Sequence, residues 1–203
     1  MKKIILSLMC AAMLIACASS PDYEDLSSEF IVSTNLDKTA VFESYDTFYV
    51  SDTIVNIGGI DEDTIWHDSD ATQLVARIKQ NMLDRGYTYV QKHQSPDLAM
   101  AVGVVKVLNI EYYPGWYTSY PGWFPFYGGY YPYYPWSTVY AYNTGTMVID
   151  TYDVKNVETK NQFRAVWSSI SFGALSSSES SNITRTENAI DQSFIQSPYF
   201  KAN

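Results

Sequence analysis

An uncharged, aromatic segment in the middle of the chain most limits how this protein of 203 residues can fold. No charged residue lies between Glu111 and Asp150, and 16 of the 31 residues from 112 to 142 are aromatic: 11 Tyr, 3 Trp and 2 Phe. Five prolines and four glycines interrupt this stretch, which carries no helix or strand pattern. Segments of this kind are uncommon in a compact domain and are usually functional or disordered, so we predict an aromatic, Pro- and Gly-rich insertion over residues 111–143.

A short motif repeats inside this insertion. Tyr113-Pro114-Gly115-Trp116 recurs seven residues later as Tyr120-Pro121-Gly122-Trp123. Proline followed by glycine predicts a type II turn with positive φ at the glycine, which brings the flanking Tyr and Trp Cα atoms within about 7 Å and pairs their rings. The candidate binding surface consists of these pairs and two later rings, namely Tyr113, Trp116, Tyr120, Trp123, Tyr134 and Trp136.

Four roles are open for such a segment. Its rings can pack on one another and on a sheet without any ligand. They can recognise a glycan, peptidoglycan or a protein, because Tyr and Trp offer a large contact area and a hydrogen-bonding group. They can contact the membrane interface, where Tyr and Trp are favoured. The fourth reading is a low-complexity or disordered stretch.

The first residues have the pattern of a secretory signal peptide. Lys2 and Lys3 precede an apolar stretch from Ile4 to Ala16 in which Ser7 is the only polar residue. This stretch is shorter than the ~20 residues that a membrane-spanning helix needs. We therefore predict a lipoprotein signal peptide over residues 1–16.

The leader is followed by a cysteine in a specific context. The motif Leu14-Ile15-Ala16-Cys17 resembles the lipobox of bacterial lipoproteins, which implies a lipid attached to Cys17 and cleavage just before it. The other cysteine, Cys10, lies in the leader, so the mature domain offers no disulfide, thiolate metal site or cysteine nucleophile. Residues 17–29 then form the lipidated N-terminus and a flexible tether, and Ala18 resembles the outer-membrane sorting signal.

The charge balance excludes some partners. The chain has 13 Lys+Arg against 22 Asp+Glu, a net charge of −9, and loss of Lys2 and Lys3 with the leader makes this 11 − 22 = −11. Such an acidic domain is not a nucleic-acid binder and is not drawn to anionic lipid by its charge. We expect a protein held at the outer membrane by its lipid, with an envelope glycan or protein as partner; the membrane face and the oligomeric state stay open.

Apolar residues repeated every three or four positions predict two helices, one before and one after the insertion. Polar residues that can cap a helix and a glycine that can end one support the boundaries. The first helix runs from Asp70 to Arg85 through Leu74, Ile78 and Met82, with Ser69 or Asp70 as N-cap and Gly86 after its end; the second contains Ile183, Glu187, Ile190 and Phe194 and stops before Pro198.

Stretches of β-branched and aromatic residues predict the strands. One of them is apolar on both faces and should be central in its sheet. With the helices, this pattern predicts an α+β fold, a mostly antiparallel sheet covered on one face by two helices, in a single domain over residues 30–203. The predicted strands lie at 30–32, 45–50, 87–91, 97–110 (the central one), 144–154 and 162–172, with an acidic loop at 56–70 and a serine-rich loop at 173–182.

Little in the sequence indicates an enzyme. The two histidines, His67 and His93, belong to no recognised catalytic motif. Acidic residues at the ends of predicted strands could supply the carboxylate pair of a glycoside hydrolase. These are Asp97, Glu111 and Asp150. The acidic loop at 56–70 could hold calcium but lacks the spacing of an EF-hand, and a solvated approach to the following helix is the alternative. We expect no metal and no cofactor.

Several short pieces of the sequence carry a family resemblance through their order. They are Val32 to Asp37, Phe42 to Tyr49, Leu83-Asp84-Arg85-Gly86-Tyr87, Ser95-Pro96-Asp97-Leu98, Gly145 to Asp150, Val166-Trp167 and Ala189-Ile190 to Pro198. In this order they resemble a family of bacterial lipoproteins known as domain of unknown function 4136. The family brings no known catalytic residue. We therefore predict a nonenzymatic, lipid-anchored structural or binding module of the cell envelope; the alternative is an envelope hydrolase acting on glycan or peptidoglycan.

Overall fold

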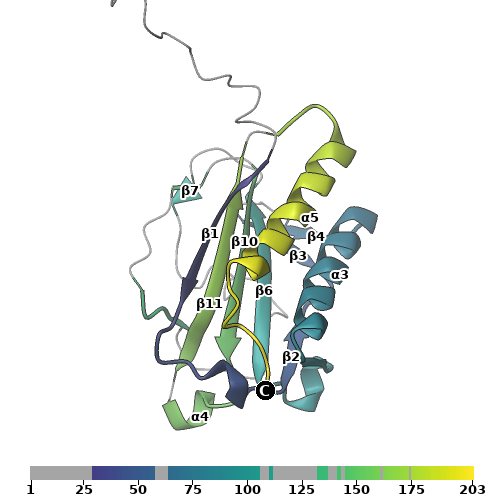
Figure 1. The fold of residues 1–203 in the computed structure, drawn as a ribbon. Coiled ribbons are helices and arrows are strands. Elements are labelled where there is room, and N and C mark those ends of the chain that lie inside the picture. The colour runs from purple at the N-terminus through teal and green to yellow at the C-terminus, as the bar shows by residue number, and fades with distance from the viewer. Residues whose placement is uncertain are drawn as a thin grey trace, which may run out of the picture.

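The computed structural model describes residues 29–57, 64–105, 110–111, 132–136, 141–142, 145–160, 162–173 and 175–203. These residues form a mixed, mostly antiparallel β-sheet and two long helices, so the predicted α+β class is confirmed (Figure 1). The strands of the main sheet are β1 (Ile31–Leu36), β2 (Thr47–Val50), β3 (Ile54–Ile57), β4 (Ile65–Trp66), β5 (Thr88–Tyr89), β6 (Leu98–Val105), β8 (Pro132–Tyr133), β10 (Thr146–Asp153) and β11 (Phe163–Phe172). The helices are α3 (Ser69–Asp84), α4 (Val157–Lys160) and α5 (Glu179–Ile195), with 3-10 turns η2 (Phe42–Ser44) and η4 (Lys92–Gln94).

The sheet has the strand order β1-β11-β10-β6-β2-β5. Its longest pairings, β1 with β11, β11 with β10 and β10 with β6, are antiparallel. On its other side β6 pairs in parallel with β2 and then with β3, through Phe48 opposite Leu98 and Val55 opposite Gly103. The strand β6 is therefore central, as its two apolar faces predict, although its described part ends at Val105.

The first helix begins one residue earlier than the sequence indicated. The N-cap is Asp68, whose Oδ1 accepts hydrogen bonds from the backbone N–H groups of Asp70 and Ala71, both at 3.0 Å. The prediction of Ser69 or Asp70 as the cap is wrong, because all three adjacent residues can cap a helix and only the geometry selects one. The end of the helix is confirmed: Gly86 has the left-handed φ of +87° that glycine accepts at this position.

The second helix also begins earlier than expected. Ser178 caps α5 and accepts a hydrogen bond from the Ser181 N–H at 3.3 Å, so the last four residues of the predicted serine-rich loop are helical. The two helices run parallel, because Gln73 bonds to Glu187 and Arg77 bonds to Asp191 one turn further along each helix. Both helices therefore begin at the same end of the domain, the upper end in Figure 1.

Other differences from the prediction are short elements. The strand β5 occupies only part of the predicted 87–91, and α4 lies in the predicted polar connection between β10 and β11. In the predicted acidic loop, β3 reaches Ile57 and pairs with β4, while residues 58–63 are outside the described part of the chain. Within the predicted insertion, β8 pairs with β11, and β7 (Ile110–Glu111) pairs with β9 (Ala141–Tyr142).

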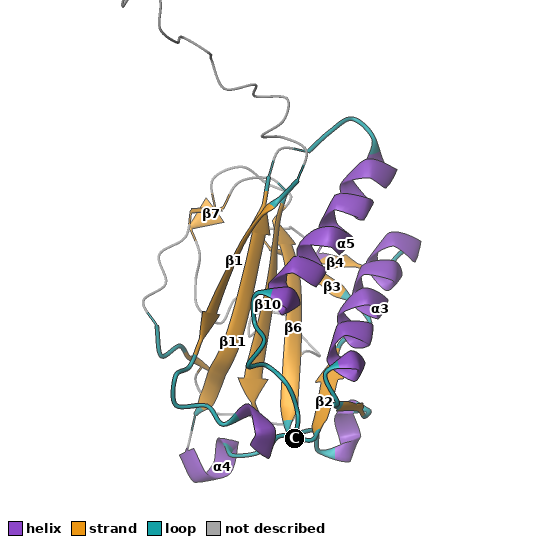
Figure 2. Ribbon diagram, viewed as in Figure 1, coloured by secondary structure: helices purple, strands orange, loops and turns teal. Residues whose placement is uncertain are grey.

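The sheet separates two hydrophobic clusters. The first contains the buried apolar side chains of α3 and α5 together with Met100, Met147 and Trp167 from the sheet. Figure 2 shows both helices on the same side of the strands. The second cluster contains alternate strand residues such as Ala101 and Val148, with the half-buried Tyr134 and Trp136 packed against it. A described piece of the aromatic segment thus covers part of the opposite face of the sheet.

One buried ion pair makes the stability of this fold depend on pH. Asp37 is 2% exposed, forms an ion pair with Arg164, and accepts hydrogen bonds from the N–H and hydroxyl of Thr39, each at 2.8 Å. Burial alone would raise the pKa of Asp37, but the bonds from Arg164 and Thr39 outweigh it and hold the pKa below its usual range. This stabilisation is present above the unfolded pKa of about 3.9 and is lost as pH falls through the lower folded value.

We therefore expect Asp37→Asn to lower the free energy of unfolding by about 2 kcal/mol at pH 7, the scale of a hydrogen bond to a charged group. The difference from the wild type should begin to shrink between pH 5 and pH 3, because protons then bind Asp37 of the unfolded chain before they bind that of the folded protein. Urea denaturation at both pH values measures this. A difference that stays constant over that range would contradict the role given to Asp37.

Candidate functional site

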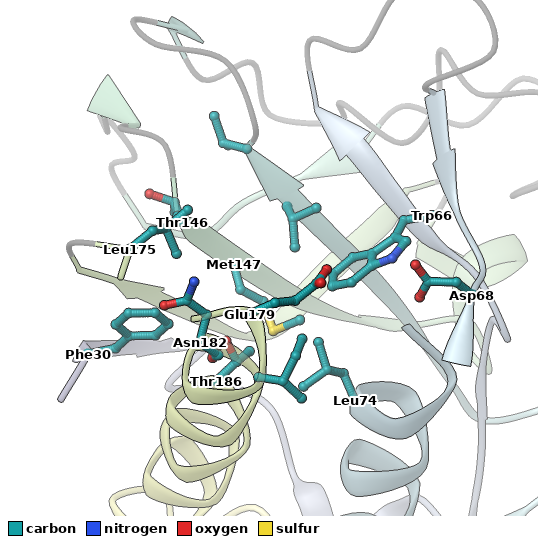
Figure 3. Close-up of a pocket in the computed structure, with 14 residues that line it drawn as sticks. Phe30, Trp66, Asp68, Leu74, Thr146, Met147, Leu175, Glu179, Asn182 and Thr186 are labelled. Atoms are coloured by element: carbon teal, nitrogen blue, oxygen red, sulfur yellow. Dashed lines mark hydrogen bonds between the residues drawn. The ribbon is translucent and has the colours of Figure 1, made fainter. Parts of the chain in front are cut away.

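A pocket of about 420 Å³ lies at the end of the domain where α3 and α5 begin. Its lining is largely apolar and comes from both helices, the sheet and the flanking segments. Figure 3 shows Phe30 and Leu175 on one side of the pocket and Trp66 with Asp68 on the other. Leu74 of α3 and Met147 of β10 lie between them, and Ile183 of α5 also lines the pocket.

The strands that precede and follow the aromatic insertion meet at this pocket. Val105 ends β6 and Thr146 begins β10, and the two residues are paired across the antiparallel ladder. Both line the pocket, as does Gly145, whose N–H donates to the Val105 carbonyl at 3.1 Å. Phe30, the second residue of the described N-terminal part, also lines it. The residue that follows the predicted tether and the strand ends on either side of the predicted insertion therefore line the same pocket.

Gly145 shapes one wall of the pocket. Its φ is +88°, and a Cβ at this position would lie 2.9 Å from the Gly173 carbonyl oxygen and 3.0 Å from Cγ of Leu175. Any larger residue here would be strained in its backbone and would push against the segment after β11. Glycine thus allows the start of β10 to lie close to the loop that leads into α5.

The polar groups of the pocket are mostly used by the fold. Asp68 caps α3, and Asn182 exchanges two hydrogen bonds of 2.9 Å with the backbone of Ser176. The hydroxyl of Thr186 donates to the Asn182 carbonyl at 2.8 Å. Glu179, in the first turn of α5, adds a second carboxylate to the lining. The pocket therefore offers an apolar interior with two acidic residues in its wall.

A second site, which is polar, lies on the opposite face of the sheet. Asp150 is fully buried, and its Oδ2 accepts hydrogen bonds from the hydroxyls of Tyr134 at 2.9 Å and Tyr152 at 3.0 Å. The two hydroxyls are 2.5 Å apart. The prediction of Asp150 at a strand end is wrong, because this residue lies inside β10. The hydrogen bond that Tyr134 donates to this carboxylate holds its aromatic ring against the sheet.

The structure describes two of the six predicted binding-surface residues. Tyr134 packs edge-to-face on Trp136, with ring centroids 5.8 Å apart, and on Tyr152 at 6.1 Å. Both predicted residues are half-buried, so these rings pack on the sheet as the first of the four roles describes. The remaining predicted residues lie outside the described residues, as do the glycines of the predicted turns. They are Tyr113, Trp116, Tyr120, Trp123 and the lipidation site Cys17.

The other candidate residues have structural surroundings. Asp97 precedes β6 and its Oδ2 accepts from the N–H groups of Asp46 at 2.7 Å and Thr47 at 3.2 Å, which positions β2. His67 and His93 are exposed, beside α3 and in η4. Glu111 lies in β7, and its side chain is outside the described residues. Among the residues that the structure describes, no group of three or more His, Cys, Asp or Glu could hold a metal ion.

Sequence reasoning missed the pocket entirely. Its lining comes from segments around residues 30, 66, 105, 146 and 180, which become neighbours only through the strand order and the parallel helices. Gly145 carried a weak signal, because a glycine just before a strand often marks a close approach of the backbone. Phe30 and Glu179 carried none, since each is ordinary in its local sequence.

These features define a small α+β domain with a helix-covered sheet and a pocket at one end. The chain belongs to the family described as "Domain of unknown function (DUF4136)", whose profile matches residues 32–199. This confirms the family resemblance drawn from the ordered sequence pieces.

Comparison with solved structures supports the same fold. The crystal structure of a DUF4136 family protein from Bacteroides thetaiotaomicron is similar, with a TM-score of 0.71 and 31% identity over 85% of this chain and 98% of that one. A PDZ domain protein from Parabacteroides distasonis is similar only at a TM-score of 0.46 and 15% identity, covering 88% of this chain and 39% of that one. No curated protein matches the chain. Within the described residues, no helix has the length and apolar character needed to span a membrane.

Proposed function

We propose that this protein is a lipid-anchored protein of the outer membrane whose α+β domain is a nonenzymatic binding module. The observation that carries the proposal is the position of the pocket. Phe30, which follows the tether, and Val105 and Gly145, which flank the aromatic segment, all line it. A ligand bound there would lie beside the ends of the two strands between which the aromatic segment is inserted.

The anchor is supported by the sequence. The dibasic leader and the lipobox-like motif that ends at Cys17 favour attachment of a lipid, and Ala18 favours sorting to the outer membrane. The net charge of −11 without the leader disfavours attraction of the domain to anionic lipid, so the lipid itself would hold the protein at the membrane.

The aromatic segment would extend the binding surface. Tyr and Trp give rigid contact area with a hydroxyl or N–H at one end, which suits a glycan, a protein partner or the membrane interface. Tyr134 and Trp136 pack on the sheet, so we assign recognition to the four earlier rings of the candidate surface rather than to these two.

Site-specific crosslinking in cells tests the binding module. A photoreactive residue at Leu175, which lines the pocket and is 49% exposed, should capture a specific molecule. The matched control is Val41, which is 60% exposed, follows β1 and does not line the pocket. Capture of the same molecules with the same yield from both positions would contradict the proposal.

One observation favours an envelope hydrolase as the second candidate. Asp68 and Glu179 line the same pocket, and a glycoside hydrolase needs two carboxylates across one cleft. The two backbone hydrogen bonds that Asp68 accepts as helix cap favour the binding module instead. Release of soluble glycan from peptidoglycan by the purified full chain, abolished by Glu179→Gln, would support the hydrolase.

A further inference from the structure

The interior of the pocket suits a hydrocarbon chain. Its walls are apolar side chains from the sheet, both helices and the flanking segments, including Val104, Met147, Leu74 and Ile183. A volume of about 420 Å³ lies within the usual range for a small-molecule site. Its polar side chains Asn182 and Thr186 are already hydrogen-bonded to the fold, so an apolar ligand would leave neither of them without a partner.

The charge of the pocket wall distinguishes between hydrocarbon ligands. Both long helices begin here, and each helix N-terminus carries about half a positive charge. Asp68 and Glu179 add two negative charges, and the Arg185 guanidinium, 4.4 Å from the ring centroid of the lining residue Phe30, adds one positive charge, so these charges nearly cancel. The wall therefore suits a headgroup that carries a positive and a negative charge and no net charge, with its ammonium near the two carboxylates.

The tether brings this pocket within reach of the membrane. Twelve residues, Ala18 to Glu29, separate Cys17 from Phe30 in the pocket lining. Such a segment spans at most about 40 Å when fully extended. With Cys17 lipidated, the pocket would therefore stay within this distance of the lipid surface, where acyl chains are the most abundant apolar ligand.

We propose that the pocket binds one acyl chain of a membrane phospholipid whose headgroup carries an ammonium, of the phosphatidylethanolamine kind. The proposal rests on the proposed anchor only for the nearness of the membrane. The apolar walls take the chain, and the carboxylates of Asp68 and Glu179 face the ammonium at the pocket wall.

Photocrosslinking in detergent micelles tests this without requiring the anchor to act. The full-length protein is mixed with phosphatidylethanolamine that carries a diazirine on one acyl chain, and crosslinked residues are located by mass spectrometry. We expect crosslinks in the pocket lining and a loss of at least tenfold in Thr186→Trp, which places a large ring in the pocket. The matched control is Thr184→Trp, one of its near neighbours on α5: Thr184 is exposed, is absent from the lining, and likewise donates its hydroxyl to the backbone four residues earlier.

A comparison of two phospholipids tests the preference for the headgroup. Phosphatidylglycerol with the same labelled chain should give several-fold less crosslinked protein than phosphatidylethanolamine. In Glu179→Gln the crosslinking yields of the two lipids should be more similar. Crosslinks that map to residues 112–142 instead of the pocket, or equal losses in Thr186→Trp and Thr184→Trp, would overturn the proposal. Fatty-acid labelling of Cys17 reports on the anchor separately, so a labelled protein without pocket crosslinks contradicts only this inference.

Discussion

Replacing Cys17 with alanine is expected to reduce incorporation of radioactive fatty acid into the protein to background. The lipobox-like motif offers one thiol for the lipid, and removing that thiol leaves no site of attachment. Each buried CH2 contributes about 0.8 kcal/mol to membrane binding, so two or three acyl chains hold a protein stably while none leaves it unanchored. Labelling of growing cells, followed by isolation of the protein, measures the effect.

The chain provides its own control for this experiment. Cys10→Ala removes the other cysteine, which lies in the apolar stretch of the leader, and should leave labelling unchanged. Equal labelling of the wild type and Cys17→Ala would show that Cys17 is not the lipid attachment site. Loss of label in both variants would point to damage to the leader rather than to a specific role for Cys17.

The long elements of this fold could be predicted because burial repeats along them. Leu74, Ile78 and Met82, chosen from their spacing, are all at most 1% exposed in α3. The strand β6 is apolar on both faces and has neighbours on both sides, so its sequence already implied a central position. Periodicity reports which residues face a core, and this information is local.

The short elements could not be predicted in the same way. Strands such as β3 and β4 contain four and two residues, too few for a period to appear. The strand β3 pairs with β6 through Val55 and Gly103, which lie far apart in the sequence, and β4 pairs with β3. The start of α5 could not be predicted for another reason. Serine is favoured in helix caps as well as in loops, so the sequence does not show whether the helix begins after Ser178 or the loop continues further.

The candidate sites depend on contacts that no local pattern records. The hydrogen bonds from Tyr134 and Tyr152 to Asp150 require a register in which Asp150 and Tyr152 share one face of β10 and the segment around Tyr134 crosses that face. The pocket likewise requires two parallel helices that begin at the same end of the sheet. Composition located the aromatic segment, but it could not show that some of its rings are packing residues.

Three of the family pieces quoted from the sequence meet in one region of the fold. Arg85, at the end of α3, donates to the backbone carbonyls of Phe194, Ser197 and Phe200. Trp167 donates its indole N–H to Ser197 Oγ at 2.9 Å. Pieces that are far apart in sequence thus join β11, α3 and the C-terminal segment, which gives a physical reason for their occurring together.

Trp167 is therefore expected to be among the most sensitive positions for stability. Its side chain is fully buried, with its ring centroid 5.3 Å from Phe194 and 5.0 Å from Phe200. Trp167→Ala leaves a cavity and removes the hydrogen bond to Ser197, so we expect a loss of about 3–5 kcal/mol in the free energy of unfolding. Stabilities of natural domains are about 5–15 kcal/mol, so this loss is a large fraction of the total.

Urea denaturation of matched variants separates this role from a general effect of removing an aromatic ring from β11. Phe172→Ala truncates an aromatic residue on the same strand that is 38% exposed, and should lower the free energy of unfolding by about 1 kcal/mol or less. Trp167→Phe keeps ring contacts but removes the donor to buried Ser197 Oγ, so its loss should lie between the two, near 1–2 kcal/mol. If Trp167→Ala were no more destabilising than Phe172→Ala, the contacts that Trp167 makes with the C-terminal segment would not explain the stability of this fold.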